Sequence, residues 1–134
     1  MNKQSESVNG NWLPAILSLG DMNQNILRLR TLTLRLLVTS DESLIKQDLD
    51  RIKGLRDSLD EAQKSYESVI STEEEAASYE NFKQAKLSYL QEQSKITAAM
   101  QQSDRDAAIE VTNGTLNSHA DSMAKALVEL SEVN

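Results

Sequence analysis

Three arginines lie close together among leucines in the stretch ILRLRTLTLRLL, residues 26–37. They are Arg28, Arg30 and Arg35. A guanidinium group is planar and holds a carboxylate through two parallel hydrogen bonds, so this cluster favours a site for a small organic anion. Alternatively, each arginine pairs with an Asp or Glu side chain of a neighbouring segment. The residues themselves leave these two interpretations open.

Arg28 and Arg35 are seven residues apart, so they share one face of a helix, and Thr31 lies between them on that face. From residue 11 to residue 39 the chain has three arginines and one acidic residue, Asp21, which gives +2. The formal net charge of the whole chain is -7, so the remainder carries -9. A cationic patch on an anionic protein favours a small carboxylate ligand and argues against nucleic acid as a partner.

Three further polar residues interrupt apolar stripes later in the chain. Lys86 lies between Phe82 and Tyr89 at a core-facing position, where an unpaired ammonium group is costly. It must pair with a carboxylate, extend its ammonium group to solvent or face a cavity that admits an anion. Tyr89 adds a hydroxyl group on the same face, and Thr112 interrupts the last stripe at the start of TNG, residues 112–114.

The sequence offers little support for catalysis. It contains no cysteine, which excludes thiolate metal sites and thiol nucleophiles. It has no glycine-rich phosphate loop, and its single histidine, His119, is interpreted as a core residue. The carboxylates are expected at solvated positions. We therefore expect a binding module, with no enzymatic activity, no metal site and no cofactor.

Apolar residues recur every three or four positions in four long blocks, which predicts helices over roughly 11–39, 42–71, 73–101 and 104–133. Thr72 and Glu75 have the spacing of a capping box at the start of the third helix. The stripe of the fourth is expected to consist of Ile109, Thr112, Leu116, His119, Met123, Ala126 and Leu130. Because the connections are short, neighbouring helices must be antiparallel. The predicted fold is a single all-α domain over 1–134, an elongated up-down-up-down four-helix bundle with both termini at one end.

The first helix has a second apolar face, opposite the stripe that the bundle needs. Its members are Leu13, Ile16, Leu17, Gly20, Leu27 and Leu34. A helix of a monomeric bundle needs only one such stripe. The second face therefore predicts a homodimer in which the first helices of two subunits meet, with Gly20 allowing a close approach. The alternative is that these are ordinary surface leucines.

The segment NWLPAILSLGDMNQNILRLRTLTLRLL, residues 11–37, resembles the first helix of the periplasmic four-helix-bundle sensor domain of bacterial chemoreceptors, the methyl-accepting chemotaxis proteins. The likeness in helix number, length and order extends from Asn9 to Val133. It implies a periplasmic domain of an inner-membrane protein, anchored at both ends by membrane segments outside these residues. It also implies that ligand binding displaces the fourth helix slightly along its axis.

The resemblance assigns roles to several residues. In the aspartate-type receptors, arginines on the first helices of both subunits hold the ligand carboxylates, and a threonine in a Thr-x-Gly-x-x-Asn stretch assists. TNGTLN, residues 112–117, matches that stretch and puts Thr112 in this role. Arg30 and Arg35 have the spacing of the first two arginines, but Thr39 stands in place of the third. An alternative register puts Arg35 at the third position and leaves the first two unmatched.

Receptors of the same family for di- and tricarboxylic or ring carboxylic acids carry a basic residue and, three residues later, a tyrosine on the third helix. Lys86 and Tyr89 have this spacing, which implies that Lys86 faces a ligand cavity. The expected function is an extracytoplasmic domain of a chemoreceptor that binds small organic acids. The alternatives are the sensor domain of a histidine kinase and a helical interaction module without a ligand.

Overall fold

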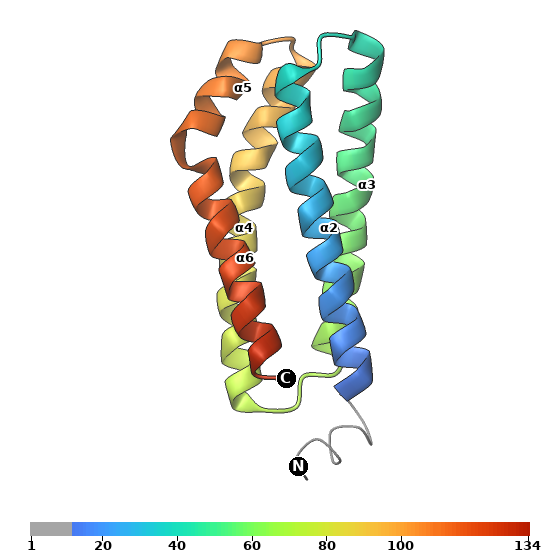
Figure 1. Ribbon diagram of the computed structural model, residues 1–134, viewed down its shortest axis with the longest axis vertical. Coiled ribbons are helices and arrows are strands. Elements are labelled where there is room, and N and C mark those ends of the chain that lie inside the picture. Colours follow the sequence, from blue (N-terminus) through green and yellow to red (C-terminus); the bar gives the residue numbers. More distant parts are fainter. Residues whose placement is uncertain (1–11) are drawn as a thin grey trace.

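The computed structural model describes residues 12–134 and confirms an all-α four-helix bundle (Figure 1). Its elements are α2 (Trp12–Val38), α3 (Glu42–Glu67), α4 (Glu73–Gln101), α5 (Arg105–Val111), the π-helical segment η1 (Thr112–Leu116) and α6 (Asn117–Glu132). The last three form the fourth rod of the bundle. Helix α2 begins and α6 ends at the same end of the molecule. The expected helix start at residue 11 and the first ten residues of the expected domain lie outside the described residues.

Side-chain caps set where α3 and α4 begin. Asp41 accepts hydrogen bonds from two backbone N–H groups in the first turn of α3. Thr72 Oγ1 accepts from the backbone N–H of Glu75 at 3.0 Å, as the capping box predicts. The Glu75 carboxylate accepts in return from the N–H of Ser71, at 3.1 Å, rather than from that of Thr72. Helix α3 ends at Glu67, before residue 71, because the chain turns there toward the start of α4.

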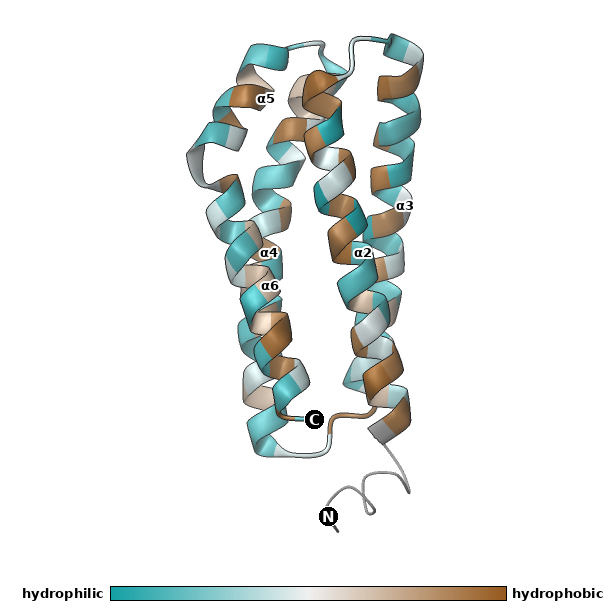
Figure 2. Ribbon diagram, viewed as in Figure 1, coloured by the Kyte–Doolittle hydropathy of each residue, from teal (hydrophilic) through white to brown (hydrophobic). Residues whose placement is uncertain are grey.

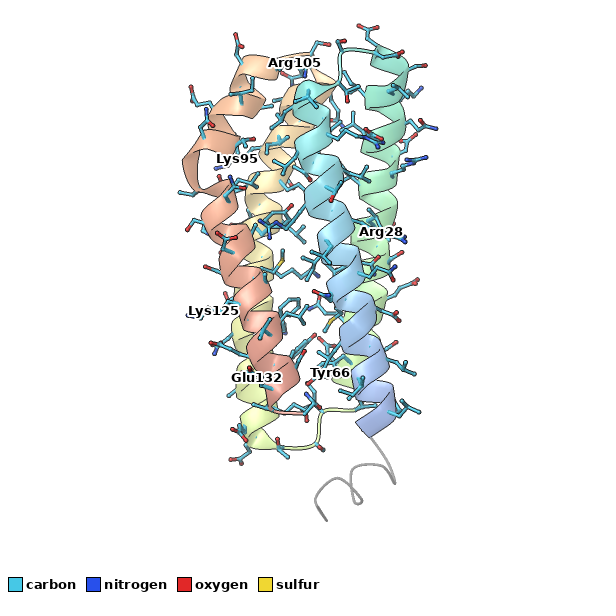
Figure 3. The ribbon with its side chains drawn as sticks, in the orientation of Figure 1. Arg28, Tyr66, Lys95, Arg105, Lys125 and Glu132 are labelled. Atoms are coloured by element: carbon cyan, nitrogen blue, oxygen red, sulfur yellow. The ribbon has the colours of Figure 1, made fainter. Side chains whose placement is uncertain are left out.

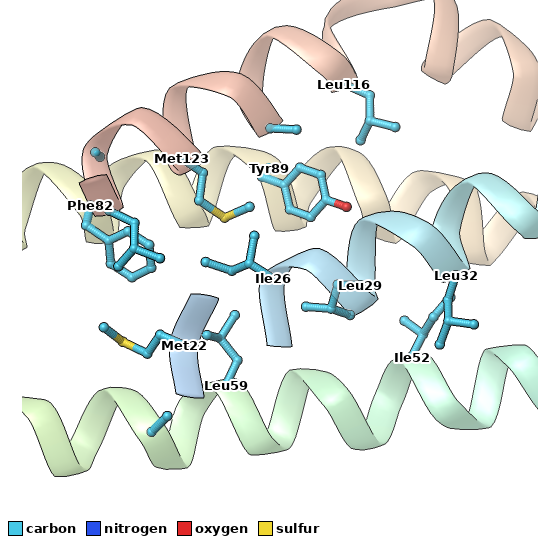
Figure 4. Packing of buried hydrophobic residues seen from close by; sticks show 14 of the residues in the cluster. Met22, Ile26, Leu29, Leu32, Ile52, Leu59, Phe82, Tyr89, Leu116 and Met123 are labelled. Atoms are coloured by element: carbon cyan, nitrogen blue, oxygen red, sulfur yellow. The ribbon is translucent and has the colours of Figure 1, made fainter. Parts of the chain in front are cut away.

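The core is a continuous column of apolar side chains to which all four rods contribute. Figure 4 shows Met22 of α2, Leu59 of α3, Phe82 of α4 and Met123 of α6 meeting in this column. All four are fully buried. Helix α2 packs mainly against α3, and α4 packs mainly against the fourth rod, so the bundle consists of two helical hairpins whose inner faces share one core.

A break in the fourth rod changes which of its residues are buried. Segment η1 contains Gly114, whose backbone angles of φ -83 and ψ -114 lie outside the helical range and kink the rod. The kink interrupts the regular turns of the helix, so the positions before it fall out of register with the stripe that an unbroken heptad predicts. Ala108 is accordingly buried and Ile109 exposed, which corrects the expected stripe.

Below the break the stripe again differs by one position from the expectation. Ala120 is buried, whereas His119 is only half-buried. Both positions follow Leu116 at helical spacing, three and four residues later.

Arg105 connects the two hairpins at the end of the bundle away from the termini (Figure 3). Its guanidinium group donates to the backbone oxygens of Leu36 at 3.1 Å, Leu37 at 2.5 Å and Thr39 at 2.5 Å. The last carbonyl groups of a helix have no partner within the helix, so these bonds cap α2 from a neighbouring rod.

The second apolar face of α2 is exposed, as its position opposite the core stripe predicts. We call it the apolar strip; its large members are Leu13, Ile16, Leu17, Leu27 and Leu34, between 37% and 60% exposed. Figure 2 shows that α2 carries hydrophobic residues along its whole length. Gly20, on the same face, has no side-chain or backbone neighbour that a Cβ atom would meet within 4 Å.

Candidate ligand-binding site on α2

Arg35 is held by a carboxylate of its own chain. Its Nε donates to Asp48 Oδ2 at 3.0 Å and its Nη2 donates to Oδ1 at 2.5 Å, which is the two-bond geometry expected for a bound ligand. The Asp48 side chain is 1% exposed and that of Arg35 is 47% exposed. The structure therefore directs Arg35 toward α3, where its guanidinium group is occupied by Asp48.

The burial of Asp48 contradicts the expectation that the carboxylates are solvated. The sequence carries a signal for it: Asp48 lies three residues after Ile45 and four before Ile52, on the apolar face of α3. Hydrogen bonds from Arg35 hold the pKa of Asp48 below its ordinary range, against the opposing effect of burial. The positive charges of Arg35 and Arg51 act in the same direction as these hydrogen bonds.

Because the pKa of Asp48 is lower in the folded protein, the free energy of unfolding depends on pH. The folded state binds a proton at Asp48 less readily than the unfolded chain does, and an aspartate in an unfolded chain titrates at about pH 4. The stabilisation is therefore complete above that pH and is lost as the pH falls through the folded-state pKa. We expect the difference in melting temperature between wild type and Asp48→Asn to narrow as the pH is lowered from 6 toward about 2.

Asp57→Asn is the matched control for this titration, because Asp57 is exposed on the same helix and forms no ion pair within residues 12–134. Its difference from wild type should stay small and constant over the same range. A gap between wild type and Asp48→Asn that does not change with pH would contradict the assignment of the acid sensitivity to Asp48.

Arg30 and Arg28 are bound much less tightly than Arg35. Arg30 Nη2 lies 3.5 Å from Asp121 Oδ1, and the Asp121 side chain is 76% exposed, so water competes for this pair. Arg28 is exposed and forms no ion pair within the described part of the chain. It lies on the side of α2 nearer to α3 (Figure 3), where it lines a surface groove together with Thr31. The Thr31 hydroxyl donates to the backbone oxygen of Leu27 at 3.0 Å.

The ammonium group of Lys86 pairs with a carboxylate of α3. It neither extends freely to solvent nor faces a cavity for an anion. Its Nζ donates to Asp60 Oδ1 at 2.6 Å and to Oε1 of the buried Gln63. Lys86 lines neither the surface groove beside Arg28 nor the small cavity beside Tyr89. Its ammonium group is thus already neutralised by a carboxylate of the neighbouring helix.

Tyr89 is buried beside a cavity of about 10 Å³, which has room for about one water molecule and not for an organic acid. Arg30 and Thr33 line the same cavity. Burial raises the pKa of Tyr89, whereas a hydrogen bond with Thr33 opposes the rise. The structure therefore brings Tyr89 close to Arg30.

Thr112 is the first residue of η1, and its hydroxyl donates to the backbone oxygen of Ala108 at 3.0 Å. It is half-buried. No hydrogen bond in residues 12–134 joins it to an arginine of α2. Within one subunit, Arg28 and Thr31 thus line one surface groove and Arg30 and Tyr89 line one small cavity, whereas the other expected residues line neither; these are Arg35, Lys86 and Thr112.

A family model described as a four-helix-bundle sensory module for signal transduction matches residues 1–134. The chain belongs to this family. This match confirms the resemblance of the sequence to the four-helix-bundle sensor domain of chemoreceptors. Comparisons with curated proteins and with solved structures found no match.

Two negative findings apply to residues 12–134 of this sensory module. No helix there is both long and apolar enough to cross a bilayer, and no three His, Asp or Glu side chains are grouped to hold a metal ion. The cations that remain available to an external anion on α2 are Arg28 and Arg30, because Arg35 is held by Asp48.

Proposed function

We propose that this sensory module binds a small organic acid at a seam between the α2 helices of two copies. The observation that carries the proposal is the position of Arg28 and Arg30. They lie on opposite borders of the apolar strip, and neither is engaged in a close ion pair within the described residues. Guanidinium groups that flank an exposed apolar face can grip a carboxylate as soon as that face is covered.

Symmetry explains how two borders of one helix can serve one ligand. In a dimer whose two-fold axis runs parallel to α2, each border of the strip meets the opposite border of the second copy. Arg30 of one subunit then lies on the same side of the seam as Arg28 of the partner subunit. Two such sites form per dimer, each with guanidinium groups from both chains, and Thr31 of the partner subunit adds a hydroxyl group nearby.

The exposed leucines of the strip support the same arrangement. An apolar face that runs along most of a helix is typical of an interface, and Gly20 has open space where another helix can come close. Burial of the strip supplies an association free energy that does not depend on the ligand. A carboxylate bound across the seam adds to it, because it contacts both chains.

The proposed signal arises because the ligand binds one arrangement of the helices more tightly than another. A ligand that contacts Arg30 of one subunit and Arg28 of the partner subunit favours the helix arrangement in which both reach it. The proposed output is a small axial displacement of the fourth rod, in a periplasmic domain of a membrane-anchored chemoreceptor. Arg30 contacts Asp121 of α6, so a ligand that attracts Arg30 changes a contact to that rod.

The test is a thermal-shift screen with succinate, citrate and 3,4-dihydroxybenzoate, followed by calorimetry with the acid that stabilises most. We expect Arg30→Ala and Arg28→Ala each to weaken its binding by about tenfold or more, because a hydrogen bond to a charged group contributes about 1.5–3 kcal/mol. Lys125→Ala removes an exposed cation from α6, far from the strip, and should leave the affinity unchanged.

Sedimentation of the same samples tests the position of the site. We expect the acid to strengthen association of wild type and not of Arg30→Ala. Unchanged affinity in both arginine variants would overturn the site, and the absence of a stabilising acid would favour a helical interaction module without a ligand.

A further inference from the structure

A groove runs along the outside of the bundle between α2 and α3, and neither the family nor the seam accounts for it. Its volume is about 640 Å³, which lies in the range of small-molecule sites. We call it the α2–α3 groove; it is lined by Leu27, Arg28, Thr31, Leu32, Arg51, Gly54, Leu55 and Ser58.

The lining combines positive charge with an apolar surface. Arg28 and Arg51 both line the groove, no acidic residue does, and neither arginine forms an ion pair within residues 12–134. Three leucines supply the apolar part, and two hydroxyl groups lie among them. Two guanidinium groups that form no ion pair among residues 12–134 and lie beside leucines are complementary to a molecule with one anionic group and an apolar body.

The antiparallel pairing of α2 and α3 determines how far apart Arg28 and Arg51 lie along the bundle axis. The Arg35–Asp48 pair sets the register between α2 and α3. Counting away from this pair along each helix places Arg51 about four residues, or roughly 6 Å, from the level of Arg28. A carboxylate between these two levels has a guanidinium group on each side, one from each helix.

Gly54 is an independent observation that points to the same groove. It lies in the interior of α3, where glycine is less favourable than alanine. A Cβ atom at this position would meet nothing within 4 Å, so packing inside the subunit does not require glycine. Its missing side chain leaves the wall of the groove open, at the level between the two arginines.

We propose that the α2–α3 groove is a second anion site, which takes a small monocarboxylate with an apolar or aromatic body. The carboxylate lies between Arg28 and Arg51, and the apolar body lies against Leu32 and Leu55. The site is complete within one subunit. It therefore does not require the seam proposed above, although Leu27, Arg28 and Thr31 belong to both.

The experiment is calorimetric titration of the protein with 3-phenylpropionate, with 3-phenyl-1-propanol as the uncharged analogue. We expect saturable binding of the acid and at least tenfold weaker binding of the alcohol. Arg51→Gln should weaken binding of the acid by about fivefold or more. Gly54→Leu should abolish it by filling the groove, without lowering the melting temperature, because leucine favours helix over glycine.

Two further variants separate binding in the groove from binding elsewhere on the protein. Lys53→Gln removes the same charge from the residue next to Gly54, at an exposed position that does not line the groove, and should leave binding unchanged. Arg30→Ala disrupts the seam site and should also leave binding of 3-phenylpropionate unchanged. Equal loss in Lys53→Gln and Arg51→Gln, retained binding in Gly54→Leu, or the absence of saturable binding would each overturn the proposal. Loss in Arg30→Ala with retention in Arg51→Gln would overturn it in favour of the seam.

Discussion

The Arg35→Ala variant is expected to unfold at a temperature at least about 5 °C below wild type, because it leaves the Asp48 carboxylate buried without its partner. Both carboxylate oxygens accept from Arg35, so a single substitution removes two charge-assisted hydrogen bonds. Differential scanning calorimetry at neutral pH measures the effect. The substitution lowers the stability of the fold and not the affinity of the folded protein for an organic acid. Any reduction in measured affinity should therefore vanish when binding is calculated for the folded fraction alone.

A double variant provides the control. Replacing both Arg35 and Asp48 by leucine removes the buried charge together with its partner, and such exchanges are often neutral. The double variant should therefore melt above Arg35→Ala. If Arg35→Ala melts at the wild-type temperature and weakens ligand binding directly, then Arg35 acts on the ligand and the structural assignment is wrong.

The Glu75→Ala variant is expected to lose about 3 kcal/mol of unfolding free energy, because Glu75 joins α3 to α4 at the end of the bundle that holds the termini. Its buried carboxylate accepts from the Tyr66 hydroxyl at 2.5 Å and from the backbone N–H of Ser71 at 3.1 Å. Asn134 Nδ2 donates to the same tyrosine oxygen at 3.0 Å, so the end of the fourth rod shares this network. Figure 3 shows Tyr66 at that end.

Urea denaturation measures this loss, and Glu74→Ala is the matched control. Glu74 lies in the same first turn of α4 but is exposed, so its removal should change stability by less than about 0.5 kcal/mol. Similar effects in the two variants would show that the charge near the helix start matters, and not the network around Tyr66. Tyr66→Phe should fall between them, because Glu75 then keeps its bond from Ser71.

The helices and their antiparallel order could be predicted because they depend on local periodicity. Apolar spacing identified the core faces of α2, α3 and α4, and the Thr72 cap follows from residues only three positions apart. The same spacing showed the second apolar face of α2, which the structure leaves exposed. Each of these features is determined by residues within a few turns of one another.

The fate of the individual cations could not be predicted in this way, since it depends on the relative level of two helices. Arg35 meets Asp48 and Lys86 meets Asp60 only because of the register within the bundle. A helix that slid by one turn would present other partners. The α2–α3 groove escaped sequence analysis for the same reason, because Arg28 and Arg51 lie on different helices.

The kink at η1 could not be predicted from the sequence for a different reason. TNG marks a weak point in the last heptad stripe, but periodicity does not say whether the helix frays, bends or takes in one more residue. The structure shows a bend, with Gly114 supplying the non-helical backbone angles. Because the helix before the kink is out of register with the stripe of an unbroken heptad, Ile109, which the stripe placed in the core, is exposed.

The same kink has a mechanical consequence. The non-helical backbone at Gly114 separates α5 from α6, in the half of the fourth rod that is farther from the start of α2 (Figure 1). Asp121, which contacts Arg30, lies on α6, which runs unbroken to Glu132. An axial displacement of Asp121 is therefore carried by continuous helix as far as Glu132, whereas a displacement of α5 has to cross the break at Gly114.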